Sequence, residues 1–122
     1  MIDPRSLFAA LFEAAVAAAD PALVIRDFLP GRPKGRVVVV GAGKASVPMA
    51  AAFDAAWDGA LAGVVVTRHG QGEGPIGAGG RIEVLAAAHP VPDEAGLRAS
   101  ARLFEAVRGL GPDDLVVSLV SG

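Results

Sequence analysis

The first part of the chain has apolar residues at the spacing of one helical face. This spacing predicts an amphipathic helix over residues 4–19, with its apolar stripe at Leu7, Phe8, Leu11, Phe12 and Val16. Pro4 suits the first turn of a helix. Pro21 would end it, because proline cannot continue the backbone hydrogen bonding.

Four later segments are almost continuously apolar, which is typical of strands buried on both faces of a sheet. They are residues 36–40, 61–67, 81–87 and 115–120. Helical segments alternate with them. Residues 45–58 combine alanines with Phe53 and Trp57, and a further helix capped by Asp93 would end near Gly109. The apolar face of that further helix is expected at Leu97, Ala101, Phe104 and Val107.

This alternation predicts a Rossmann-like, doubly wound α/β fold, with a mostly parallel sheet and helices on both faces. The sequence stops at Ser121 and Gly122, where such a fold would continue into another helix. We therefore expect residues 1–122 to be the N-terminal part of a Rossmann-like domain of a longer protein, incomplete at its C-terminus, with a downstream domain absent. Residues 69–80 include six glycines and predict a mobile surface loop.

Composition and charge argue against several classes of function, including nucleic-acid binding and metal binding. A chain of 122 residues is enough for one domain, and a net charge of −2 offers no general attraction for nucleic acid. Without cysteine there is no thiolate metal site, and with two histidines we expect no metal site. No apolar run reaches the ~18 residues of a membrane-spanning helix, and Glu13 interrupts the stretch that faintly imitates a secretion signal. We expect a cytoplasmic protein without a membrane partner.

The first predicted strand leads into a glycine-containing turn at the sheet edge where ligands of parallel sheets bind. The turn comprises Gly41, Ala42, Gly43, Lys44, Ala45 and Ser46. Pro48 suits the first turn of the next helix, so that free amides should converge here. A cation at a helix N-terminus is disfavoured by about 0.3–1 kcal/mol, which favours an anion beside Lys44. The alternative is a plain tight turn with a solvated lysine.

This turn differs from two familiar phosphate-binding motifs. A P-loop would need glycine where Val38 stands and serine or threonine where Ala45 stands. A dinucleotide fingerprint would need glycine or alanine at Ser46 and an acidic residue near Arg68. The sequence is therefore not a P-loop, and it gives weak support to NAD, although Arg68 would suit a 2′-phosphate.

Other polar residues follow the later strands. His89 and Asp93 lie in a proline-rich turn after the third strand, and Ser121 and Gly122 follow the fourth. All four are candidates for substrate or phosphate binding at the same sheet edge. Each also has a simpler explanation, as a packed loop residue, a helix cap or an ordinary turn. His69, at the start of the glycine-rich loop, is expected to be a surface residue.

Four segments in register resemble the N-terminal region of the glycerate 2-kinase family, whose members were often named hydroxypyruvate reductase. They are RVVVVGAGKAS at residues 36–46, VVTRHG at 65–70, AHPVPDEAG at 88–96 and DLVVSLVSG at 114–122. Two positions depart from the family pattern, which commonly has an aromatic residue at His69 and a histidine at Gln71. The family is several times longer than this chain.

The resemblance implies ATP-dependent phosphorylation of D-glycerate to 2-phosphoglycerate, with ATP and Mg²⁺ as cofactors and Lys44 as the active-site lysine. The turn residues expected to serve substrate or phosphate binding are Gly41, Ala42, Gly43 and Ser46. We expect the isolated chain to be inactive. Two alternatives remain: an NAD(P)-dependent hydroxypyruvate reductase, and a nucleotide-binding domain without enzymatic activity. The oligomeric state is left open, with a homo-oligomer among the options.

Overall fold

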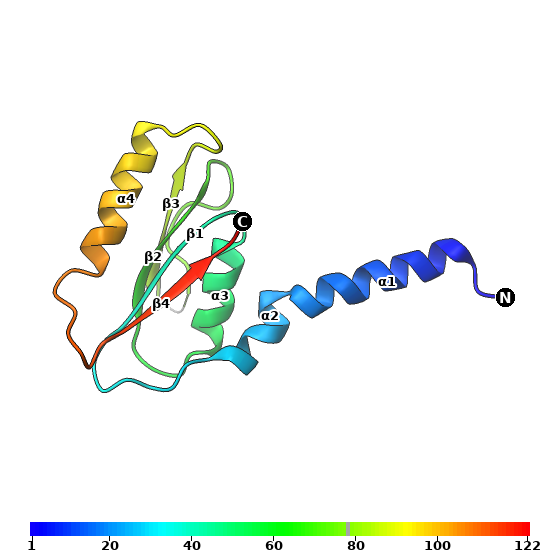
Figure 1. Ribbon diagram of the computed structural model, residues 1–122, viewed down its shortest axis with the longest axis horizontal. Helices are drawn as coiled ribbons and strands as arrows, with labels where there is room; N and C mark the ends of the chain where they lie inside the picture. Colours follow the sequence, from blue (N-terminus) through cyan, green and yellow to red (C-terminus); the bar gives the residue numbers. More distant parts are fainter. Residues whose placement is uncertain (78) are drawn as a thin grey trace.

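The computed structural model describes residues 1–77 and 79–122 of the chain (Figure 1). In chain order its elements are α1 (Pro4–Ala19), α2 (Pro21–Val24), the 3-10 helix η1 (Ile25–Phe28), β1 (Val37–Ala42), α3 (Ser46–Ala56), β2 (Ala62–Arg68), β3 (Ile82–Ala87), α4 (Glu94–Ala106) and β4 (Leu115–Val120). The sequence pattern predicted all of these except α2 and η1, which follow Pro21.

The four strands form one parallel sheet in the order β3-β2-β1-β4. Helices α3 and α4 lie on opposite sides of it (Figure 1). β1 is central, because Ala42 pairs with Val66 of β2 on one side and with Val120 of β4 on the other. This arrangement confirms the predicted α/β fold class with a parallel sheet covered on both faces.

The best-packed part of the core lies between α3 and the sheet. Val39 and Val65 from the central strands are fully buried there, together with Ala50 of α3. Phe53 is 1% exposed, and its ring stacks on Trp57 with 5.4 Å between the ring centroids. The small side chain of Ala50 lets the helix lie close to the strands while the two aromatic rings fill the remaining space.

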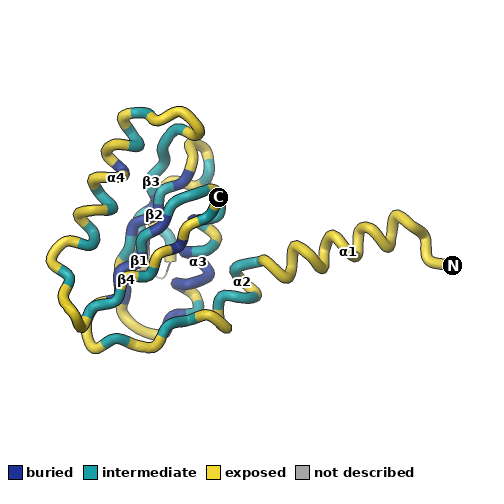
Figure 2. The backbone as a smooth tube through the Cα atoms, in the orientation of Figure 1, coloured by how far each residue is buried: buried dark blue, intermediate teal, exposed yellow. Residues whose placement is uncertain are grey.

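α1 extends away from the sheet, and none of its residues is buried (Figure 2). The helix forms as predicted, with Asp3 capping its first turn through a 3.0 Å bond from the Ser6 amide. Its apolar stripe nevertheless stays largely exposed, since Phe8 is 68% exposed and Phe12 71%. Within the described residues no single helix is long and apolar enough to cross a membrane. α1 and the Pro21–Phe28 segment reach that length and composition only as a pair bent by 58°.

The structure corrects the predicted packing face of α4. Leu97 and Phe104, two of the expected core positions, are 73% and 74% exposed, and Ala101 is exposed too. The buried residue of this helix is Ala99. The prediction followed the largest apolar side chains, whereas the helix approaches the sheet through a small one.

β4 corrects a second expectation, that of a strand buried on both faces. It lies at an edge of the sheet, and only Leu119 is buried. Val116 and Val120 point to the opposite face and are 43% and 66% exposed. An apolar run indicates that a strand is able to be buried on both faces. It does not indicate whether another element covers each face.

Several boundaries also differ from the predictions. Gly41 and Ala42 belong to β1 and not to the turn, because their backbone pairs with both neighbouring strands. α4 ends at Ala106, before the predicted end near Gly109. Part of the glycine-rich loop runs back along β3, where the Ile76 amide donates to Ile82 O at 2.8 Å. Residue 78 of that loop lies outside the described residues.

The start of β1 is held to the start of β4 by Asp114. Its carboxylate accepts hydrogen bonds from the amides of Gly111 (2.8 Å) and Arg36 (2.6 Å) and pairs with the Arg36 guanidinium at 3.0 Å. The Gly111 amide, followed by Arg36, lowers the pKa of this carboxyl from 3.8 to about 2. A carboxyl with a lowered folded-state pKa stabilises the fold above its unfolded value, and that stability is lost as the pH falls through the folded value.

We therefore expect Asp114→Asn to lower the free energy of unfolding at neutral pH and to flatten its decline between about pH 4 and 2. Denaturant titrations over this pH range measure both effects. Asp113→Asn is the control, because in the described part of the chain the Asp113 side chain has no hydrogen-bond or ion-pair partner. An equal pH slope in the wild-type chain and Asp114→Asn would contradict the assignment.

Candidate anion-binding site

The turn between β1 and α3 presents backbone N–H groups at the carboxyl edge of the sheet. α3 begins at Ser46, and its N-cap residue Ala45 has no side chain that could accept a hydrogen bond from the first helical turn. The Ala45 amide donates to Ser121 Oγ at 2.9 Å. Among the described residues, the amides of Lys44 and Val47 have no acceptor. An anion placed at this helix N-terminus would receive these two N–H groups and the favourable end of the helix dipole.

Both glycines allow the turn to pack closely against β4. A Cβ atom at Gly41 would overlap Leu119 O, and a Cβ at Gly43 would overlap Ser121 Oγ and its carbonyl oxygen. Gly43 also has a φ of 116°, which other residues rarely adopt. The absence of a Cβ at Gly43 therefore lets Ser121 lie against the turn. In the structure both glycines contact other residues of this chain, Gly41 at Leu119 and Gly43 at Ser121.

Ser46 lies inside the fold. It is fully buried, and its Oγ is 2.7 Å from Gly43 O and 3.0 Å from Val66 O. The Gly43 amide donates to the same Val66 O at 3.1 Å. These bonds tie the turn to the end of β2, so the Ser46 hydroxyl shapes the turn. Direct phosphate binding by Ser46 stays a prediction.

Lys44 is exposed at the tip of the turn. Its ammonium group has no ion-pair or hydrogen-bond partner among residues 1–77 and 79–122. A lysine at the positive end of a helix dipole, next to unpaired amides, is a cation where cations are least stable. The binding of an anion at this turn stays a prediction.

Asp93 and His69 form a second polar group at the same edge. Asp93 caps α4 by accepting from the Gly96 amide at 2.9 Å, and it also accepts from the Ala88 amide at 3.2 Å. Its Oδ2 lies 3.0 Å from His69 Nε2. These bonds lower the pKa of the Asp93 carboxyl from 3.8 to about 2, the His69 side chain contributing most. The predicted role of Asp93 as the N-cap of α4 is confirmed. Its contact with the His69 ring was not predicted from the sequence.

His89 is exposed and lies beside this pair. It lines a cavity of about 410 Å³ whose other lining residues are Arg68, His69, Gly70, Gln71 and Ala88. His69 is exposed, as the sequence predicts for a surface residue. Its pairing with Asp93 was not predicted. A signal existed, since both residues follow the carboxyl ends of strands that the pattern predicted to lie in one sheet.

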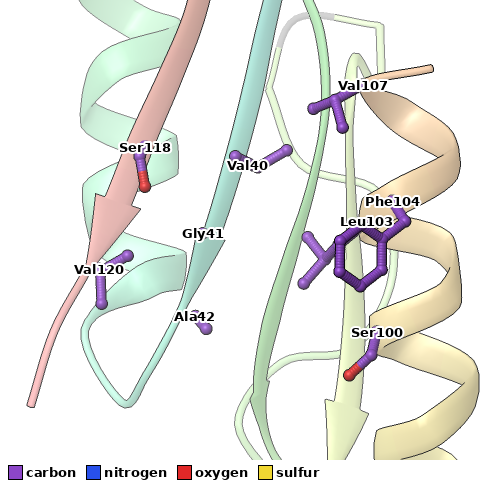
Figure 3. A pocket seen from close by; sticks show the side chains of 9 residues that line it. All are labelled: Val40, Gly41, Ala42, Ser100, Leu103, Phe104, Val107, Ser118 and Val120. Carbon is purple, nitrogen blue, oxygen red and sulfur yellow. The ribbon is translucent and has the colours of Figure 1, made fainter.

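A second cavity, of about 320 Å³, lies between α4 and the strands β1 and β4. Leu103 and Phe104 project from α4 towards the sheet here, and the only side-chain polar atoms are the hydroxyls of Ser100 and Ser118 (Figure 3). The cavity reaches Gly41 and Ala42 near the end of β1. With an apolar lining and no charged group, it offers nothing that would hold a phosphate or a carboxylate. Gly122, the last candidate residue, is exposed at the end of the chain.

The parallel sheet, the helices on both of its faces and the glycine turn at its carboxyl edge define a Rossmann-like α/β domain. Residues 7–122 match the family described as a domain of unknown function, DUF4147. The chain belongs to this family, whose domain is the N-terminal region of glycerate kinases.

Relatives and a solved structure agree with this assignment. The chain is 56% identical, over 99% of its length, to a provisionally named hydroxypyruvate reductase from Agrobacterium vitis. It is 37% identical, over its whole length, to the D-glycerate 2-kinase of Thermotoga maritima. The crystal structure of the PH0495 protein from Pyrococcus horikoshii OT3 is similar over the whole chain, with a TM-score of 0.81 and 29% identity. The chain spans 27%, 30% and 30% of these three proteins, respectively.

Proposed function

We propose that this chain is the N-terminal region of a glycerate 2-kinase, which transfers the γ-phosphoryl group of ATP to the 2-hydroxyl of D-glycerate and releases 2-phosphoglycerate and ADP. The observation that carries the proposal is the position of Lys44 at a helix N-terminus. Among the described residues, its ammonium group and the amides of Lys44 and Val47 have no partner. The name of the Thermotoga maritima relative supports the same reaction. Because the chain covers less than a third of that relative, we expect it to be inactive alone.

The chemistry of phosphoryl transfer suits this turn. Charge is spread over the oxygens of the transferred group, and the reaction is accelerated mainly by positive charge and hydrogen-bond donors fixed in place. Lys44 and the amides of Lys44 and Val47 are such groups. They would hold either the transferred phosphoryl group or the glycerate carboxylate, since both are anions of similar size.

ATP and Mg²⁺ place different demands on the chain. The turn fits a phosphate group of ATP for the reasons above, and Mg²⁺ would supply charge neutralisation at the phosphates. Among the described residues no group of three or more histidine, aspartate or glutamate side chains could hold a metal ion. The phosphate oxygens of ATP would supply part of the coordination of the expected Mg²⁺.

The second candidate is an NAD(P)-dependent hydroxypyruvate reductase. The name of the Agrobacterium vitis relative favours it, and a Rossmann-like turn is able to hold a pyrophosphate. Against it, β2 ends in Thr67 and Arg68, where an NAD-binding domain carries an acidic residue for the ribose. A nucleotide-binding domain without catalytic activity is the third candidate, and it would show no turnover with either substrate pair.

An assay of both reactions separates the candidates. We would make a hybrid enzyme in which this chain replaces the matching 27% of the Agrobacterium vitis relative, and assay that relative in parallel. We expect ADP formation with D-glycerate and ATP, and no oxidation of NADH or NADPH with hydroxypyruvate. Nicotinamide oxidation without ADP formation would overturn the kinase proposal, and no turnover by the hybrid beside an active parent would favour the non-catalytic candidate.

A further inference from the structure

The His69 ring has one nitrogen paired with Asp93 and one that has no hydrogen-bond partner among the described residues. Nε2 lies 3.0 Å from Asp93 Oδ2, and two backbone amides hold the Asp93 carboxylate in place. A carboxylate only accepts hydrogen bonds, so this contact places the proton on Nε2. In the neutral ring Nδ1 then carries a lone pair. The nearest charged atom to Nδ1 is Glu73 Oε1 at 3.9 Å, beyond hydrogen-bond distance.

An imidazole oriented by a carboxylate, with its second nitrogen open, is the arrangement of a general base. The charged and titratable groups around this ring are Asp93 at the start of α4, Glu73 in the glycine-rich loop, and Arg68 and His89 along the same cavity. Both carboxylates lie within 4 Å of a ring nitrogen, Asp93 at 3.0 Å and Glu73 at 3.9 Å. Arg68 offers positive charge to an anionic substrate.

The position of His69 relative to Lys44 follows from the strand register. Ala42 of β1 pairs with Val66 of β2, so Lys44 and Arg68 each lie two residues beyond a paired position on neighbouring strands. The turn and the end of β2 are also joined through Val66 O, which accepts from the Gly43 amide and lies 3.0 Å from Ser46 Oγ. His69 therefore follows the end of the strand that neighbours β1, at the same carboxyl edge of the sheet as Lys44.

We propose that His69, which stands where the family commonly has an aromatic residue, is the proton acceptor for the substrate hydroxyl in this chain's form of the proposed kinase reaction, and that Asp93 is its positioning residue. This inference rests on the proposed function. The 2-hydroxyl of D-glycerate gives its proton to His69 Nδ1, and its oxygen forms a bond to the γ-phosphorus of ATP. The bond from that phosphorus to the bridging oxygen breaks, and its electron pair leaves with ADP.

The test measures kcat, KM and their pH dependence in the hybrid enzyme with His69→Gln and Asp93→Asn. His69→Gln is expected to lower kcat by about 10²-fold or more and to remove the acid limb of the kcat/KM profile. Asp93→Asn retains a residue that caps helices, so α4 should persist. It is expected to lower kcat, because an amide can donate as well as accept and no longer fixes the ring proton on Nε2. Imidazole added to His69→Ala should restore part of the activity.

Glu94→Gln is the matched control, since Glu94 lies next to Asp93 and its exposed side chain makes only a long i,i+4 pair with Arg98. It should leave kcat and the pH profile unchanged. Circular dichroism of each variant shows whether the fold is retained. An active hybrid in which His69→Gln keeps both kcat and the acid limb would overturn this inference alone. A hybrid that forms no ADP before any substitution would overturn the proposed function, and the inference with it.

A second readout needs no activity. Nitrogen-15 NMR of the histidine rings in the 122-residue chain distinguishes the two neutral tautomers. The inference expects the Nε2–H form for His69 in the wild-type chain and a loss of this preference in Asp93→Asn. A proton on Nδ1 in the wild-type chain would overturn the inference, because that nitrogen could not then accept one from a substrate.

Discussion

Replacing Lys44 with alanine is expected to lower kcat/KM for ADP formation in the hybrid enzyme by about 10²- to 10³-fold, the effect of removing one donor from a site that stabilises developing negative charge. The amides of Lys44 and Val47 would remain, so the site would keep part of its ability to bind an anion. Because Lys44 is exposed and its side chain has no partner among the described residues, the substitution should leave the fold intact. The free energy of unfolding should rise slightly, since a cation is removed from a helix N-terminus.

The way the loss divides between kcat and KM decides which anion Lys44 holds. If the ammonium group stabilises the transferred phosphoryl group, kcat falls and KM for D-glycerate stays nearly constant. If it binds the glycerate carboxylate equally in the ground and transition states, KM for D-glycerate rises instead. Both outcomes are read from the same steady-state kinetics.

Lys34→Ala is the matched control for this experiment. Lys34 is the only other lysine of the chain, and it is also exposed, in the segment before β1 and thus at the opposite end of that strand. We expect it to leave the kinetics unchanged. Equal kinetics for Lys44→Ala and the wild-type hybrid would remove the physical basis of the proposed function, since the turn would then hold no reacting group.

Local pattern was sufficient to predict the strands and their parallel arrangement. The valine run that precedes Gly41 has no polar position, and only a strand covered on both faces can bury it. The same reasoning placed the turn at the ligand edge of the sheet, because a parallel strand must be followed by a crossover. Capping by Asp93 was predictable for a similar reason, as the bond to the Gly96 amide connects residues three apart.

Which apolar side chains are buried was not predictable, because their burial depends on neighbouring elements that lie far away in the sequence. Leu97 and Phe104 have the spacing of a core face, yet the buried contact of α4 is made by Ala99. Val116 and Val120 belong to a strand as apolar as β1, but β4 has a neighbour on one side only. Hydrophobic periodicity identifies the surface that a segment is able to bury, and the order of strands decides which surface is buried.

The candidate site also has features that the sequence predicts and features that it does not. The position of Lys44 at the start of α3 follows from residues within one turn of the chain, and it was predicted. Ser121 against the turn and His69 against Asp93 are contacts between residues 76 and 24 positions apart, respectively. Such contacts need the strand order and register, which no local pattern supplies. Gly43 connects the local pattern with the long-range contact, since its lack of a Cβ lets Ser121 lie against the turn.

The largest expected effect on stability is that of Phe53→Ala, which should lower the free energy of unfolding by about 3–5 kcal/mol. Phe53 is 1% exposed, and its ring fills the space between α3 and the sheet against Trp57. The substitution removes a large apolar side chain and leaves a cavity that the surrounding valines, which belong to paired strands, cannot close. Urea denaturation of the 122-residue chain, followed by far-ultraviolet circular dichroism, measures the change.

Phe8→Ala provides a control with the same chemical change at a different place in the fold. Phe8 lies on α1 and is 68% exposed, so truncation there removes little buried area and should change the free energy of unfolding by less than about 0.5 kcal/mol. Fluorescence of Trp57, the single tryptophan, should respond to Phe53→Ala and not to Phe8→Ala. Equal losses in the two variants would mean that the apolar stripe of α1 is packed in solution, and that the core extends beyond the sheet and α3.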